Sequence, residues 1–215
     1  MYTEAISDPL WGLLKRLSAF PEMKFAYLGG GTALSLQLGH RKSEDLDFFL
    51  IDEFDELAFM RSIQRSGLDT LVTNQTSNHT QLMIQSSKVD LIQSRMPLKF
   101  TLKAIHPETA NLKMADAKDI GRMKIMAIGS RGSKKDFVDL YCLTREIIPL
   151  ESLIAMAMEE DRGIRYSKLL FLKGLVDFEE ADLEGDVSMI WDKSWGEIKG
   201  SLKEEVKEIA KKTCQ

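Results

Sequence analysis

Two aspartates separated by one residue stand in an apolar run of strand length. Asp45 precedes the segment Leu46–Ile51, and Asp47 lies within it. Side chains two positions apart on a strand project from the same face, so the two carboxylates are expected to lie side by side. Like charges on a buried strand cost several kcal/mol unless a cation stands between them. The pattern therefore predicts a site for a hard divalent ion, Mg²⁺ or Mn²⁺.

A glycine-rich turn precedes the aspartates. The segment Lys24–Leu28 has the composition of a strand and stops at Gly29–Gly31. Thr32–Leu38 then reads as a short helix closed by Gly39. Glycines let the backbone approach a ligand closely, and the first turn of a helix offers N–H groups to phosphate. We therefore expect a triphosphate to lie there, and the predicted phosphate contacts are Gly30, Gly31, Thr32, Arg41 and Ser43.

The stretch that joins the turn to the aspartates reads GGGTALSLQLGHRKSEDLDFF. It resembles the signature of nucleotidyltransferases of the DNA polymerase beta superfamily, and most closely the AbiEii/AbiGii toxin family. That resemblance implies a third carboxylate on a later strand, for which Asp90 in Lys88–Ile92 is the candidate. It also implies a helix with K-x-x-A and a helix like K-D-x-x-D-L-Y, which Lys124–Ala127 and Lys135–Tyr141 match.

The resemblance implies a role for each of these side chains. Asp45, Asp47 and Asp90 would hold Mg²⁺ or Mn²⁺ on the triphosphate, with Asp90 also activating the acceptor hydroxyl. Lys124 would stabilise negative charge on the phosphates or on the leaving pyrophosphate. Asp136 would orient Lys124 or accept a proton. Asp139 fits the same helical motif, and by spacing alone the two helical acids could equally form one solvated face.

The resemblance implies transfer of a nucleoside monophosphate from a nucleoside triphosphate to an acceptor hydroxyl. An RNA acceptor, the 3′ end of transfer RNA, is our first expectation, with a cognate antitoxin protein as partner. Two alternatives remain at this point. The same core modifies small molecules such as aminoglycosides, or hydroxyls on proteins. The chain could also be an inactive binding module built on this fold.

Composition limits these possibilities. The 215 residues, 44% of them hydrophobic, are enough for a substantial core. The formal net charge of −4 excludes a global basic footprint for nucleic acid, so contacts with RNA would be local. Candidate basic positions are Arg41, Lys42, Arg131, Lys134 and Lys135. The cysteines and histidines lack the spacing of a zinc site: Cys142, Cys214, His40, His79 and His106.

The order of predicted elements indicates an α+β protein. We expect a polymerase beta-like nucleotidyltransferase core in residues 1–110, a mixed sheet flanked by helices. Residues 111–215 are expected to form a helical lobe that completes the active-site cleft, and no strand is expected there. Neither a signal peptide nor a membrane-spanning stretch is evident, so we expect a cytoplasmic protein without membrane contact. The predicted helices include 53–65, 115–128, 133–147, 151–160, 166–178 and 188–211.

Overall fold

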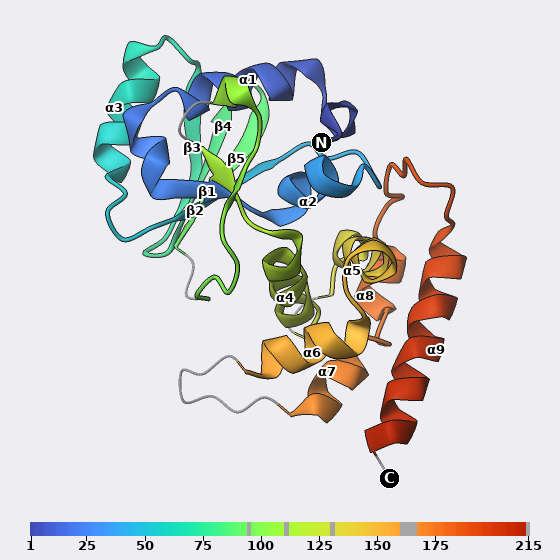
Figure 1. Cartoon of the computed structure of the whole chain (residues 1–215). Helices are drawn as coiled ribbons and strands as arrows, with labels where there is room; N and C mark the ends of the chain where they lie inside the picture. Colours follow the sequence, from blue (N-terminus) through green and yellow to red (C-terminus); the bar gives the residue numbers. More distant parts are fainter. Residues whose placement is uncertain (94–95, 110–111, 130–131, 160–166, 214–215) are drawn as a thin grey trace. The chain divides into compact units, whose positions relative to one another are not determined.

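A computed structural model describes residues 1–93, 96–109, 112–129, 132–159 and 167–213 (Figure 1). It contains two compact units, Met1–Asp116 and Ala117–Gln215. The basic residue Arg131 and the second cysteine, Cys214, lie outside the described residues. Cys142 is a buried thiol. None of the described helices combines the length and the apolar composition that crossing a bilayer requires.

The described strands of the first unit form one mixed sheet in the order β3-β4-β5-β2-β1-β7-β6. Their bounds are β1 (Ala26–Leu28), β2 (Leu46–Leu50), β3 (Thr70–Gln75), β4 (His79–Ile84), β5 (Ser87–Gln93), β6 (Lys103–Ala104) and β7 (Lys113–Met114). β2 runs parallel to β5, and β1 runs parallel to β7. The other neighbouring strands are antiparallel.

Helices pack around this sheet within the first unit (Figure 1). They are α1 (Asp8–Ser18), α2 (Gly30–Leu38) and α3 (Glu56–Arg65), with 3₁₀ turns at Thr3–Ala5, Pro21–Phe25 and Pro107–Thr109. Ser7 caps α1 by accepting a hydrogen bond from the amide of Leu10. The leucines that recur at helical spacing along α1 are almost fully buried: Leu10, Leu13, Leu14 and Leu17.

The regular elements in the described part of the second unit are all helices. Its helices are α4 (Ala117–Ile128), α5 (Lys134–Glu146), α6 (Leu150–Met158), α7 (Lys168–Gly174), α8 (Glu179–Leu183) and α9 (Trp195–Thr213) (Figure 1). Trp195 packs against aromatic side chains of this unit: its ring centroid lies 5.6 Å from that of Phe178 and 6.1 Å from that of Phe137. The predicted α+β class, a mixed sheet flanked by helices and followed by a helical part, is confirmed.

Some sequence-based boundaries are wrong for local reasons. Lys24 and Phe25 do not extend β1, because the chain after Pro21 forms a 3₁₀ turn up to Phe25. The helix predicted from residue 53 begins at Glu56, since the carboxylate of Asp55 caps it by accepting from the amide of Ala58.

The helix predicted from residue 188 begins at Trp195. Ser194 and Glu197 form a capping box there, in which the Ser194 amide donates to the Glu197 carboxylate at 2.8 Å. The region beyond residue 110 also holds a strand, β7, which pairs with β1 and was not expected. The two compact units divide after Asp116, and the functional domains 1–110 and 111–215 stay a prediction.

Candidate active site

The sheet places Asp47 and Asp90 side by side. Their strands, β2 and β5, are parallel neighbours, and the two aspartates are direct register partners. Residues in register on adjacent strands project from the same face of a sheet. The buried Leu46 and Phe48 take the opposite face of β2, so the apolar alternation fixes which way Asp47 points.

Asp45 and Lys88 lie two residues before Asp47 and Asp90, at the next positions on the same face of the sheet. Pairing of β2 with β5 starts at Leu46 and Val89, so Asp45 and Lys88 stand at corresponding positions just before it. Burial would lower the pKa of Lys88, but a hydrogen bond to Asp90 and the charges of Asp90, Asp45 and Asp47 outweigh it and raise that pKa. One ammonium thus feels three carboxylates. We call Asp45, Asp47, Asp90 and Lys88 the acidic cluster.

The glycine turn lies directly against the acidic cluster. The amide of Gly29 donates to the carbonyl of Asp47 at 2.9 Å. Gly30 opens α2 with φ +60°, and a Cβ added to it would stand 1.9 Å from Asp47 Oδ2. Only glycine suits this position, because any other residue would be strained and would collide with the carboxylate. Gly31 follows in the first turn of α2.

The predicted side-chain contacts to phosphate, Thr32, Arg41 and Ser43, are buried in the structure. Thr32 Oγ1 lies 2.7 Å from Ser43 Oγ and also contacts the carbonyl oxygen of Asp45. The Arg41 guanidinium donates to the carbonyl of Lys42 at 2.9 Å. The contacts of Thr32 link residues 43–45 to the first turn of α2 and so position the chain where it enters β2.

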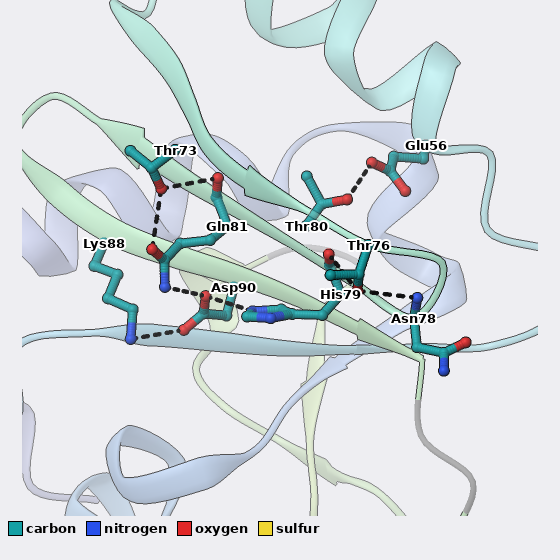
Figure 2. Close-up of polar contacts among 9 residues, drawn as sticks. All are labelled: Glu56, Thr73, Thr76, Asn78, His79, Thr80, Gln81, Lys88 and Asp90. Carbon is teal, nitrogen blue, oxygen red and sulfur yellow. Dashed lines mark hydrogen bonds and ion pairs between the residues drawn. The ribbon is translucent and has the colours of Figure 1, made fainter.

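Two neighbours of Asp90 were missed from the sequence. His79 Nε2 lies 2.8 Å from Asp90 Oδ1, and the amide nitrogen of Gln81 lies 3.2 Å from the same oxygen (Figure 2). Both come from β4, whose residue Gln81 is the register partner of Asp90. The signal that fixes this register is a two-residue hairpin turn at 85–86 with both φ angles positive. Its sequence, Gln85-Ser86, lacks the glycine or asparagine that announces such a turn.

The helical motif residues gather in a separate cluster within the second unit, which we call the Lys124 cluster. Lys124 Nζ lies 2.8 Å from Asp136 Oδ1 and 2.6 Å from Asp139 Oδ2, and all three side chains are buried. Both helical acids therefore bind Lys124, and neither belongs to a solvated face. Burial would raise the pKa of Asp136, but the charge of Lys124 and hydrogen bonds from Lys124 and Ser133 lower it.

The acidic cluster has the donor chemistry of a magnesium or manganese site. Within the described ranges, no three His, Cys, Asp or Glu side chains are already grouped as a metal cage. The cluster nevertheless supplies carboxylate oxygens from two adjacent strands, and its three acids outnumber its one lysine. Hard divalent ions prefer such oxygen ligands, and their charge would balance the excess. Asp45, Asp47 and Asp90 therefore fit the metal.

Comparison with known families identifies the family of this chain. The model of the nucleotidyl transferase AbiEii toxin of type IV toxin–antitoxin systems matches residues 12–212. This chain belongs to the AbiEii toxin family. It is also 34% identical over 198 residues to an uncharacterized protein of Aquifex aeolicus (strain VF5), a match that covers 85% of this chain and 86% of that protein.

Solved structures share the fold at low identity. JHP933 of Helicobacter pylori has a TM-score of 0.59 at 18% identity, covering 96% of this chain and 94% of its own. The nucleotidyltransferase toxin MenT4 of Mycobacterium tuberculosis H37Rv has a TM-score of 0.60 at 15% identity, covering 92% and 82%. The antibiotic-resistance factor ANT(2″)-Ia has a TM-score of 0.54 at 15% identity, covering 70% and 91%.

Membership of the AbiEii family gives the reaction class. The chain is a nucleotidyltransferase, its substrate is a nucleoside triphosphate, and its family role is that of a toxin. The type IV toxin–antitoxin system to which the family belongs implies an antitoxin protein as partner.

Proposed function

We propose that this AbiEii protein transfers a nucleoside monophosphate to the 3′ hydroxyl of transfer RNA in a reaction that depends on Mg²⁺ or Mn²⁺. The observation that carries the proposal is the contact between the glycine turn and the acidic cluster. Gly30 packs against the Asp47 carboxylate, and Asp47 is the register partner of Asp90. A triphosphate at this turn would lie beside oxygen ligands suited to its metal.

The bond changes follow from the reaction class. The acceptor hydroxyl oxygen forms a bond to the α-phosphorus, the bond from that phosphorus to the bridging oxygen breaks, and pyrophosphate leaves. A bound metal ion would polarise the phosphoryl group and offset the charge that builds on its oxygens. Asp90 helps to draw the proton from the attacking hydroxyl. Gly30, Gly31 and Thr32 hold the β- and γ-phosphates.

Four further side chains complete the proposed set. Arg41 and Ser43 steady the nucleotide through the segment that enters β2, where both are buried. Lys124 stabilises negative charge on the phosphates or on the leaving pyrophosphate. Asp136, which contacts Lys124 at 2.8 Å, orients its ammonium. The protein acts in the cytoplasm, where its nucleotide and transfer-RNA substrates occur.

The test is incubation of the purified protein with Mg²⁺, total transfer RNA and each of four α-labelled nucleoside triphosphates. The inactive control is Asp45→Ala/Asp47→Ala, and Asp69→Asn is the matched control because its exposed carboxylate lies in the same unit. Label on RNA, present in Asp69→Asn and lost in the double variant, is the expected result. Label on a protein or on an aminoglycoside, with none on RNA, would show that this other molecule, and not transfer RNA, is the acceptor. Nucleotide binding without any transfer would favour an inactive module.

A further inference from the structure

The two carboxylate oxygens of Asp90 are held by different kinds of partner. Oδ1 accepts from His79 Nε2 at 2.8 Å and from the amide of Gln81 at 3.2 Å, and both donors belong to the neighbouring strand β4 (Figure 2). Oδ2 contacts the ammonium of Lys88 at 3.0 Å. Lys88 stands on the same strand as Asp90, two residues earlier and on the same face.

The donors that contact Asp90 Oδ1 are held by further contacts. Gln81 is the cross-strand partner of Asp90, and its amide oxygen accepts from the hydroxyl of Thr73 at 3.0 Å (Figure 2). Because the amide oxygen is engaged with a donor, the amide nitrogen is the end that faces Asp90. Gln81 and His79 lie on β4, which pairs in register with the strand of Asp90, so the two donors to Oδ1 are positioned by the sheet itself.

The partner of Asp90 Oδ2, Lys88, is less firmly held. The Lys88 side chain is 40% exposed, whereas that of Asp90 is only 6% exposed. A lysine ammonium rides on four flexible methylenes and is readily hydrated, so it can leave a carboxylate without disturbing the backbone. Lys88 also feels the charges of Asp45 and Asp47. It therefore supplies positive charge to the same carboxylates that the metal would need.

We propose that Lys88 is the resident counter-cation of the acidic cluster, which a divalent metal displaces from Asp90 Oδ2 while His79 and Gln81 keep Oδ1 in position. The inference rests on the proposed function, since it assigns the metal to Asp45, Asp47 and Asp90. The proposal predicts that Lys88 affects metal binding in the opposite direction to His79 and Gln81. Lys88 stabilises the metal-free protein and opposes metal binding. His79 and Gln81 are positioning residues that favour metal binding, because hydrogen bonds to a ligating carboxylate orient it.

The experiment measures Mn²⁺ binding to the purified, metal-free full chain by calorimetry, without nucleotide. Lys88→Met is expected to bind Mn²⁺ about tenfold more tightly than the wild type, because a repelling charge has gone and Oδ2 is released. His79→Ala is expected to bind it about tenfold more weakly. Lys103→Met is the matched control: Lys103 contacts Asp116 at 2.9 Å with a side chain 48% exposed, in the same unit, and its loss should leave Mn²⁺ affinity unchanged.

Thermal unfolding gives a second readout that does not depend on activity. Metal-free Lys88→Met should melt below the wild type, and saturating Mn²⁺ should raise its Tm by more than it raises that of the wild type. This comparison also shows whether the variant is folded. Equal or weaker Mn²⁺ binding by Lys88→Met, with normal binding by the wild type, overturns the displacement and leaves the metal assignment intact. If neither protein binds Mn²⁺, the metal assignment of the proposed function fails, and this inference fails with it.

Discussion

The acidic cluster and the Lys124 cluster, both among the described residues, each set one lysine among several aspartates, and they differ in how completely they are enclosed. In the Lys124 cluster the ammonium lies within 2.8 Å of both Asp136 and Asp139, and all three side chains are buried. In the acidic cluster three carboxylates share Lys88, whose side chain is 40% exposed. The first cluster is closed and tightly paired. The second has excess negative charge and a partly exposed cation, which suit a site that receives ligands.

The largest expected effect is on the acidic cluster. Asp47→Asn keeps the size and shape of the side chain but removes one of the charges proposed to bind the metal, so transfer activity should fall about 10³-fold and Mn²⁺ affinity should largely disappear. Far-UV circular dichroism should be unchanged. Asp69→Asn, an exposed acid in the same unit, should retain full activity. Wild-type transfer by Asp47→Asn would remove Asp47 from the site and break the contrast between the clusters.

The closed cluster should respond through stability. Lys124→Met leaves two buried carboxylates without their ammonium, which costs about 3–5 kcal/mol of unfolding free energy. Lys88→Met breaks a more exposed ion pair and should cost under about 1 kcal/mol. Urea unfolding of the two variants measures both values. Equal losses would show that the two clusters are enclosed to the same degree, and loss of transfer with unchanged stability would make Lys124 purely catalytic.

The aspartates and Lys124 of the two clusters could be predicted from the sequence, but the hydrogen bonds around Asp90 could not. Alternating apolar residues fixed the face of Asp47, whereas the contact of Asp136 with Lys124 was expected from the family resemblance and not from the spacing of the helical acids. Strands of two residues, such as β6 and β7, carry no periodic pattern and were missed. So was the network around Asp90. Its donors belong to a neighbouring strand, and their identity depends on a register that the Gln85-Ser86 turn does not announce.

Alanine substitutions at two glycines, Gly30 in the turn and Gly12 in α1, test how closely the turn packs against the acidic cluster. Gly30→Ala should destabilise the protein by about 1–3 kcal/mol, because φ is +60° and the new methyl group would meet Asp47 Oδ2. Gly12→Ala is the opposite control: it lies within α1, and an added Cβ has no atom within 4 Å. Alanine there should stabilise by about 0.5–1 kcal/mol. Chemical denaturation measures both, and a neutral Gly30→Ala would mean that the turn does not bear on the acidic cluster.

The smallest expected effect is the response of the Lys124 cluster to acid. Lys124 holds the pKa of Asp136 below its unfolded value, despite burial, so the charged form of Asp136 stabilises the native state. This contribution is complete above the unfolded pKa and is lost as pH falls through the lower folded pKa. Asp136→Asn lacks it at every pH.

The Tm of Asp136→Asn should therefore lie below that of the wild type near neutral pH, and the two should converge as pH falls below about 4. Other carboxylates with lowered pKa values, such as Asp182 and Glu197, remain in both proteins, so the difference in Tm isolates Asp136. A difference that stayed constant down to the lowest pH would mean that Asp136 contributes by packing and hydrogen bonding rather than by charge. The closed character of the Lys124 cluster would then rest on Asp139, its other acid.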